Sequence, residues 1–142
     1  MIQFHELRVG DIVLVEFDGQ RKEGQVIGLN GEDKEINMQI GVQSEFWYTP
    51  KDLYPILLDE DQLMQLGFEK QEFADGEVKY MKGPFRILLS EKGNFSRLEM
   101  WYREDRRHIT QPLMVHQLQN HYHQMTKVDL GRPVREDLVR VI

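Results

Sequence analysis

The chain contains no cysteine among its 142 residues. Without a thiol it can form no disulfide, no zinc–thiolate centre and no cysteine nucleophile. Such a composition fits the reducing cytosol, and we expect a cytoplasmic protein. The start of the chain, MIQFHELRVGD, lacks the basic residues and the apolar core of a signal peptide. No apolar run approaches the roughly 18 residues of a membrane-spanning helix, so we expect no membrane partner.

Motifs for common enzyme chemistries are also missing. The chain has no G-x-x-x-x-G-K-[S/T] phosphate loop, no G-x-G-x-x-G turn and no G-x-S-x-G nucleophile elbow. A weak enzyme pattern remains in Glu77-Val78-Lys79, which follows the acidic run Asp59, Glu60 and Asp61. Metal-dependent nucleases combine such groups to hold Mg²⁺ and to steady the attacking water. Triplets of this kind arise often by chance in a chain that is 30% charged, so a nuclease is the least favoured reading.

Acidic side chains outnumber basic ones by 24 to 18, and the excess is uneven along the chain. Residues 1–58 hold ten acidic and five basic side chains, whereas residues 103–142 hold five acidic and seven basic ones. The acidic first part repels phosphate, which leaves the last third as the region that could face a nucleic acid. We interpret most of its charge as solvated surface. The arginines of this third are Arg103, Arg106, Arg107, Arg132, Arg135 and Arg140.

Short strands separated by turn signals fill the first 58 residues. Residues 12–17 are apolar or β-branched at nearly every position, and Asp18-Gly19 is a hairpin signal. Residues 36–40 alternate between apolar and polar side chains, as a half-buried strand does. Five short strands at this spacing predict a small barrel. The expected strands cover residues 12–17, 25–29, 36–40, 44–49 and 54–58.

The stretch VGDIVLVEFDGQRKEGQVIGL resembles the opening of SH3-like barrels of the KOW and Tudor kind. This resemblance implies a fold and no particular function, because such barrels serve many purposes. The matching residues are Gly10, Asp11, Val13, Val15, Gly19, Gly24 and Val26.

The second part of the chain predicts a helix, an antiparallel meander and a second helix. Asp59 can cap the first helix, Gln62 completes a box-like pattern, and Gly67 ends the helix. Pro112 suits the start of the last helix. We therefore expect an α+β protein, with a five-stranded SH3-like barrel in residues 1–58 and a helix–sheet–helix lobe with a C-terminal tail in residues 59–142. The strands expected in this lobe are residues 69–73, 78–81, 85–90, 95–102 and 108–110.

Three histidines crowd the last helix in the stretch VHQLQNHYHQM. On a helical wheel His116 and His123 share the face opposite the apolar stripe, while His121 borders that stripe. His116 and His123 are seven residues apart, which is about 10.5 Å along a helix axis and too far for one metal ion. We expect polar-face histidines, no metal site and no cofactor.

A second resemblance covers most of the chain up to about residue 126. The helix PILLDEDQLMQLGFEK, a strand meander and the later VHQLQNHY resemble a recurring set of short bacterial proteins of unknown activity, some of them phage-derived. The resemblance implies no catalytic residue. It suggests that His116, Gln119 and Asn120 make defined contacts, such as side-chain hydrogen bonds that cap a sheet edge. The matching positions are Pro55, Ile56, Leu58, Leu63, Leu66, Gly67 and Phe68, then Val115, His116, Leu118, Gln119, Asn120 and Tyr122.

Strand alternation places Trp101 on a mixed surface. Residues 95, 97, 99 and 101 are Phe95, Arg97, Glu99 and Trp101, whereas Ser96, Leu98, Met100 and Tyr102 form the expected buried set. A large ring on a polar face needs cover from a partner, from a second copy or from the rest of the chain.

The aromatic and basic residues together give the functional prediction. We expect a non-enzymatic protein that binds a protein partner or itself, with nucleic-acid association as the alternative. Trp101 would be the centre, because tryptophan beside arginine is typical of interfaces. The binding residues that we expect are Trp101, Arg97, Phe95, Arg103, Arg106, Arg107 and Trp47.

Overall fold

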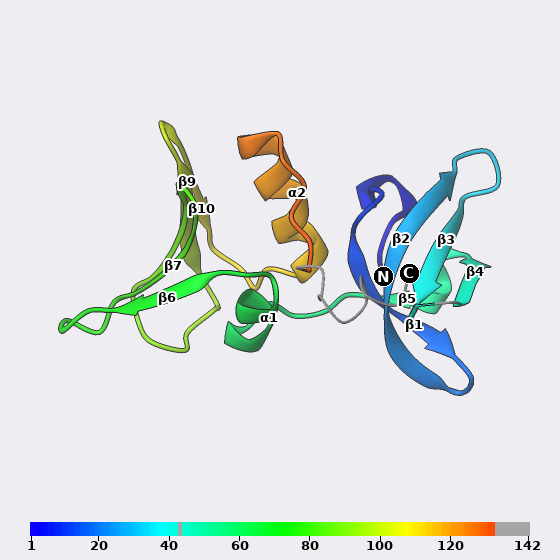
Figure 1. Cartoon of the computed structure of the whole chain (residues 1–142), viewed down its shortest axis with the longest axis horizontal. Coiled ribbons are helices and arrows are strands. Elements are labelled where there is room, and N and C mark those ends of the chain that lie inside the picture. Colours follow the sequence, from blue (N-terminus) through cyan, green and yellow to red (C-terminus); the bar gives the residue numbers. More distant parts are fainter. Residues whose placement is uncertain (43, 133–142) are drawn as a thin grey trace, which may run out of the picture. The chain divides into compact units, whose positions relative to one another are not determined.

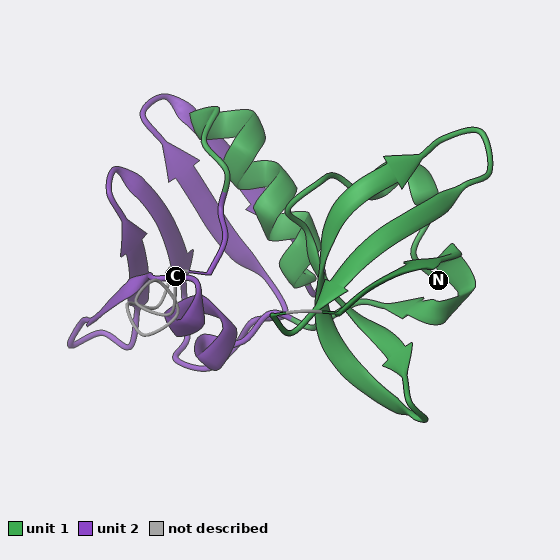
Figure 2. Ribbon diagram, turned by 45° about the vertical axis from the view of Figure 1, so that its right-hand side comes forward, with its two compact units in different colours: residues 1–57, 113–129 green, residues 58–112, 130–142 purple. Residues whose placement is uncertain are grey.

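The computed structural model describes residues 1–42 and 44–132 (Figure 1). It confirms a mixed α+β protein, with two antiparallel five-stranded sheets and two α-helices in the described chain. The chain divides into two compact units. The first combines residues 1–57 with 113–129, and the second combines residues 58–112 with 130–142 (Figure 2). The expected division into two consecutive lobes therefore differs from the structure, because the chain leaves the first unit and later returns to it.

The sheet of the first unit has the strand order β4-β3-β2-β1-β5. Its hairpin between β1 and β2 turns at Asp18 and Gly19, with φ values of 53° and 76°. Positive φ at both turn residues is what a two-residue hairpin requires, so the Asp-Gly prediction is confirmed. Among the described residues β4 and β5 remain the two edges, so the ladder is not closed into a barrel. The strands are β1 (Ile12–Phe17), β2 (Gln20–Asn30), β3 (Glu35–Ile40), β4 (Ser44–Tyr48) and β5 (Leu53–Tyr54).

Every second side chain of strand β3 in the first sheet is buried. Ile36, Met38 and Ile40 are buried, as the sequence pattern predicted. Two short 3-10 helices, η1 (Phe4–Glu6) and η2 (Pro50–Asp52), precede β1 and β5. The apolar core of this unit consists of Ile2, Leu7, Val13, Val15, Val26, Ile36, Met38, Ile40 and Leu53.

The second unit is a helix followed by a meander. Helix α1 (Glu60–Gln65) begins where the side chain of Asp59 accepts a 2.9 Å hydrogen bond from the backbone N–H of Gln62, so the predicted cap is confirmed. The sheet order is β10-β9-β8-β7-β6, with each strand paired to its neighbour in sequence. The strands are β6 (Glu69–Glu72), β7 (Val78–Lys82), β8 (Phe85–Leu89), β9 (Leu98–Tyr102) and β10 (Asp105–Ile109).

Side chains on one face of the second sheet are buried, and the sequence explains why. The buried residues of β7, β8 and β9 are apolar and occupy alternate positions, which gives the sheet one apolar face. β9 begins at Leu98 and not at residue 95, and Ser96 before it is exposed. The buried residues on this face are Val78, Tyr80, Phe85, Ile87, Leu89, Leu98 and Met100.

Helix α2 (Val115–Thr126) belongs to the first unit and not to the second lobe, where we expected it. Gln119 fixes it to the start of β1. The Gln119 Oε1 atom accepts a 2.8 Å bond from the N–H of Ile12, and its Nε2 atom donates a 2.8 Å bond to the carbonyl of Gly10. Asn120 Nδ2 donates to the backbone carbonyl of Glu6 and to Asp11 Oδ2, both at 3.2 Å. Of these side-chain hydrogen bonds, only the one from Ile12 involves a strand residue, and the others join α2 to residues that precede β1.

The prediction for His116 was wrong, because this residue is only 1% exposed. Its ring nitrogens have no hydrogen-bond partner, and Nε2 lies 3.9 Å from Glu6 Oε2. Burial lowers the pKa of His116, and the nearby Glu6 carboxylate opposes that shift. The face of α2 that carries His116, Gln119 and Asn120 packs on other residues of the first unit, so it does not face solvent. His121 and His123 are partly exposed.

Candidate functional site

The second sheet leaves one of its faces outside the core, and we call this the outer face. Its side chains alternate with the buried set along β7, β8, β9 and β10, and each of them is exposed or only partly buried. Trp101 is among them, as the alternation of β9 predicted. The outer face consists of Lys79, Met81, Arg86, Leu88, Glu99, Trp101, Arg106 and His108.

Trp101 lies between cationic side chains that come from both sides of β9. In the strand register, Arg106 of β10 is its partner on one side and Arg86 of β8 is its partner on the other. The Arg106 guanidinium is 5.0 Å from the Trp101 ring centroid, and Lys79 Nζ from β7 is 5.3 Å from it. Lys79 Nζ also lies 5.4 Å from the ring of Phe73. Contacts of this kind hold cations against aromatic rings with modest energy.

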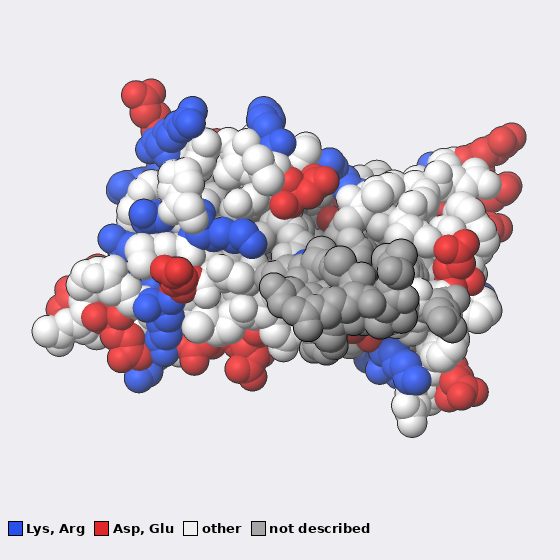
Figure 3. Space-filling model, in the orientation of Figure 1, with Lys and Arg blue, Asp and Glu red and all other residues white. Residues whose placement is uncertain are grey.

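Several of these cations have no carboxylate partner. Within residues 1–42 and 44–132, no ion pair joins an acidic side chain to Lys79, Arg86, Arg97 or Arg106. Arg86 instead donates to the backbone carbonyls of Gly83 and Phe85. Figure 3 shows Lys and Arg side chains gathered over the part of the molecule where Figure 1 draws β7, β9 and β10. An acidic ligand would find unpaired positive charge here.

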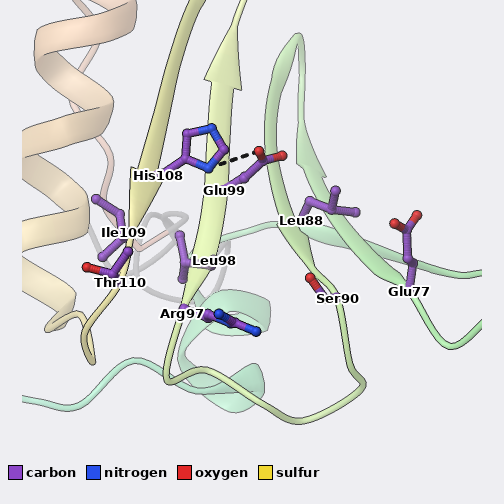
Figure 4. A pocket seen from close by; sticks show the side chains of 9 residues that line it. All are labelled: Glu77, Leu88, Ser90, Arg97, Leu98, Glu99, His108, Ile109 and Thr110. Atoms are coloured by element: carbon purple, nitrogen blue, oxygen red, sulfur yellow. Dashed lines mark ion pairs between the residues drawn. The ribbon is translucent and has the colours of Figure 1, made fainter.

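The acid at the centre of the outer face, Glu99, is already engaged. His108 Nδ1 lies 3.1 Å from Glu99 Oε1, and the two residues are cross-strand partners. Beside this pair the sheet surface is hollowed by a pocket of about 380 Å³ (Figure 4). The pocket is lined by Glu77, Leu88, Ser90, Arg97, Leu98, Glu99, His108, Ile109 and Thr110.

Some of the expected binding residues lie elsewhere. Phe95 packs toward the buried side, with its ring 6.1 Å from that of Tyr80. Arg107 follows the buried parity of β10 and pairs with Asp105, and Arg103 lies over the ring of Tyr102 in the turn after β9. Strand parity failed for Phe95 because residues 91–97 form bends and turns before β9 begins.

The remaining expected residues fall outside this sheet face. Arg132 donates a 2.9 Å bond to Gln62 of α1, and Arg135 and Arg140 lie outside the described residues. Trp47 belongs to the first unit, where it is 53% exposed on the edge strand β4, next to Phe46, which is 47% exposed.

Sequence reasoning missed Lys79 and Arg86 as members of the outer face. The signal was present, because both residues alternate with buried apolar residues in β7 and β8. The pocket could not be found in the same way. It depends on how the ends of several strands are aligned, and that register is not visible in any single strand.

The geometry does not assemble the nuclease pattern. Lys79 points to the outer face, whereas Glu60 accepts a 2.9 Å hydrogen bond from the hydroxyl of Tyr80, which points to the buried face. Glu60 also pairs with Lys70. In the described part of the chain, no group of three or more His, Asp or Glu side chains is arranged to hold a metal ion.

Comparisons with family models, with curated proteins and with solved structures find no match for this chain. Among the described residues, no helix has both the length and the apolar character needed to cross a membrane.

Proposed function

We propose that this is a non-enzymatic binding protein whose outer face receives an acidic segment of a protein partner. The observation that carries the proposal is Trp101, which lies partly buried between Lys79 and Arg106 on a face with unpaired cations. Carboxylates of a partner would pair with these cations and guide its approach. The tryptophan would supply the apolar anchor that interfaces concentrate in a few residues.

The arrangement around Trp101 favours a peptide over a nucleic acid. Single-stranded nucleic acids stack their bases on free aromatic faces. Lys79 and Arg106 lie 5.3 Å and 5.0 Å from the ring centroid of Trp101, so a stacking base would compete with these cations for the ring. A carboxylate can bind either cation while it stays over the ring. Nucleic-acid association is the second candidate, because the unpaired cations would also attract phosphate.

The test is a binding titration with two labelled probes, an acidic peptide of alternating Glu and Leu and a single-stranded oligothymidine. We expect the peptide to bind more tightly, with an affinity that falls as salt rises. Trp101→Ala should weaken peptide binding by about 2 kcal/mol, or roughly 30-fold. Circular dichroism of the variant checks that it is folded. Tighter binding of the oligothymidine would replace this proposal with the nucleic-acid one.

Two neighbouring arginines give a matched pair of variants. Arg106 lies on the outer face and Arg107 follows the buried parity of the same strand. We expect Arg106→Gln to weaken peptide binding several-fold. Arg107→Gln should change it by no more than about twofold, because Arg107 does not lie on the face that would contact the peptide. Equal effects of the two substitutions would show that general charge, and not the outer face, binds the peptide.

The acidic segment can belong to another protein or to the first unit of a second copy, which carries most of the net negative charge of the chain. Sedimentation at low and high salt separates these cases. Self-association that is lost in high salt and in Arg106→Gln supports a second copy, whereas a monomer at all concentrations assigns the surface to another protein.

We also propose that the first sheet is an SH3-like barrel that stays open between β4 and β5. Support comes from the strand order, in which β5 returns to pair with β1 at the edge opposite to β4. The resemblance to short bacterial and phage-derived proteins stays a prediction. Within it, the Gln119 and Asn120 positions have a structural reason, since both hold α2 on the first unit.

A further inference from the structure

The pocket beside the His108–Glu99 pair includes four residues that lie one position beyond the last paired residues of neighbouring strands. Val78 pairs with Leu89, so Glu77 and Ser90 come next on β7 and β8. Leu98 pairs with Ile109, so Arg97 and Thr110 come next on β9 and β10. A row of polar side chains therefore crosses the end of the outer face, as Figure 4 shows. The pocket volume of about 380 Å³ lies within the range of small-molecule sites.

Two opposite charges face this pocket without a partner. Within the described residues, neither the Glu77 carboxylate nor the Arg97 guanidinium makes a side-chain ion pair or hydrogen bond. They do not pair with each other, because Ser90 lies between them (Figure 4). Their strands, β7 and β9, are separated by β8, which places their backbones about 9.6 Å apart at the usual strand spacing.

Two further residues of the pocket contact each other. His108 and Glu99 form the 3.1 Å pair described above. Besides this contact pair, the pocket holds one carboxylate, that of Glu77, and one guanidinium, that of Arg97, neither with a side-chain ion pair within the described residues. A simple anion would bind Arg97 but would face Glu77 across the pocket. A simple cation would bind Glu77 but would face Arg97 across the pocket.

We propose that this pocket binds a zwitterion of the α-amino-acid class, with its ammonium group at Glu77 and its carboxylate at Arg97. In such a molecule the two charged groups are about 3 Å apart, given ordinary covalent geometry. With a charge-assisted hydrogen bond of about 2.8 Å on each side, the whole assembly spans about 9 Å, and the flexible side chains of Glu77 and Arg97 rise from strands whose backbones are about 9.6 Å apart. The hydroxyl groups of Ser90 and Thr110 lie along the same row.

The rest of the pocket suits an aliphatic side chain. The side chain of Leu88 lies on the outer face, whereas Leu98 and Ile109 line the pocket from the buried parity of β9 and β10. Leucine is therefore the reference ligand for the test. This inference goes beyond the proposed function, since it concerns a small molecule and depends on Glu77, which the peptide-binding surface does not use.

The experiment is an NMR titration of the full chain with leucine, N-acetyl-leucine, leucinamide and inorganic phosphate. N-acetyl-leucine lacks the ammonium group and leucinamide lacks the carboxylate. We expect leucine to shift the amides of residues 88–90, 97–99 and 108–110 saturably, and each analogue to bind at least about tenfold more weakly, since each loses one charge-assisted hydrogen bond. No saturable shift with leucine, equal binding of either analogue, or preferential binding of phosphate would overturn the proposal.

Variants test the assignment of the two ends. Glu77→Gln and Arg97→Gln should each weaken leucine binding at least about tenfold, whereas Glu104→Gln, in the exposed turn after β9, should leave it unchanged. The double exchange Glu77→Arg with Arg97→Glu keeps both charges and should bind more tightly than either single exchange. Leucine binding that survives Glu77→Gln would contradict the proposal. Acidic-peptide binding should survive that substitution, so the failure of one proposal can be told from the failure of the other.

Discussion

Asp11 is a carboxylic acid that the fold leaves only 2% exposed. Burial raises its pKa to about 6 from 3.8, although hydrogen bonds from the backbone of Arg8 and from Asn120 oppose the shift. The folded state therefore holds this proton more tightly than the unfolded chain does. The contribution of Asp11 to the free energy of unfolding is largest below pH 4 and declines as the pH rises from 4 to 6.

The substitution Asp11→Asn tests this single residue. An amide oxygen can accept the two bonds that Asp11 Oδ2 now accepts, at 2.9 Å from Arg8 N and 3.2 Å from Asn120 Nδ2. We expect the variant to be more stable than the wild type at pH 7, by up to about 3 kcal/mol, with the difference shrinking toward pH 4. Urea unfolding of both proteins across this range measures it. A difference that stays constant with pH would show that Asp11 does not titrate in the folded state as described.

His116 and Gln119, the two buried polar residues of α2, show what a helical pattern in the sequence predicts and what it leaves open. A helical wheel correctly predicts that His116 and Asn120 share a face. It does not say which face the rest of the chain covers. The polar face is buried here because Gln119 satisfies a backbone N–H and a backbone carbonyl in the first unit. Hydrogen bonds of this kind remove most of the cost of burying polar groups.

For helix α2 as an element, Gln119 and His116 should behave in opposite ways. Replacing Gln119 with Leu leaves Ile12 N–H and the Gly10 carbonyl without their partner, and each buried orphan group costs about 1–3 kcal/mol. Replacing His116 with Leu removes a ring that makes no hydrogen bond, so its cost should stay below about 1 kcal/mol. Thermal or urea unfolding of both variants compares them. Equal destabilisation would mean that α2 is held by packing alone.

The strands show the same division between local pattern and register. Alternation predicted the buried side chains of β3 and most of those of β9, because a regular strand repeats every two residues. It failed for Phe95, where the backbone bends before β9 begins. The pocket could not be predicted from the sequence for a related reason. Glu77, Ser90 and Arg97 are neighbours only through the pairing of three strands, and pairing register is a tertiary property.

In the whole molecule, residues 58–112 of the second unit lie in sequence between the two segments of the first unit. The chain leaves the first unit at Leu57 and returns to it at Leu113. These ends lie side by side, since Leu57 and Met114 form a β-bridge and the N–H of Val115 donates a 2.8 Å bond to the carbonyl of Ile56. Residues 1–57 therefore contain the first sheet but not the helix that caps the start of β1.

This arrangement predicts the behaviour of fragments. Residues 1–57 alone should give a poorly dispersed NMR spectrum, because the partners that Gln119 supplies to Ile12 and Gly10 are missing. Joining residues 1–57 to 113–129 through a short Gly-Ser linker should restore dispersion, as the two ends are adjacent. A well-dispersed spectrum from residues 1–57 alone would show that the first sheet is stable without α2.

The binding surface itself can be tested with the two tryptophans of the chain. Each gives one indole N–H signal in an NMR spectrum, and Trp47→Phe identifies which signal is which. Trp101 lies on the outer face of the second sheet, and Trp47 lies on β4 of the first unit. On titration with the acidic peptide, we predict a saturable shift of the Trp101 signal and no change in that of Trp47. A shift confined to Trp47, or no shift of Trp101 while the peptide binds, would contradict the assignment of the outer face as the binding surface.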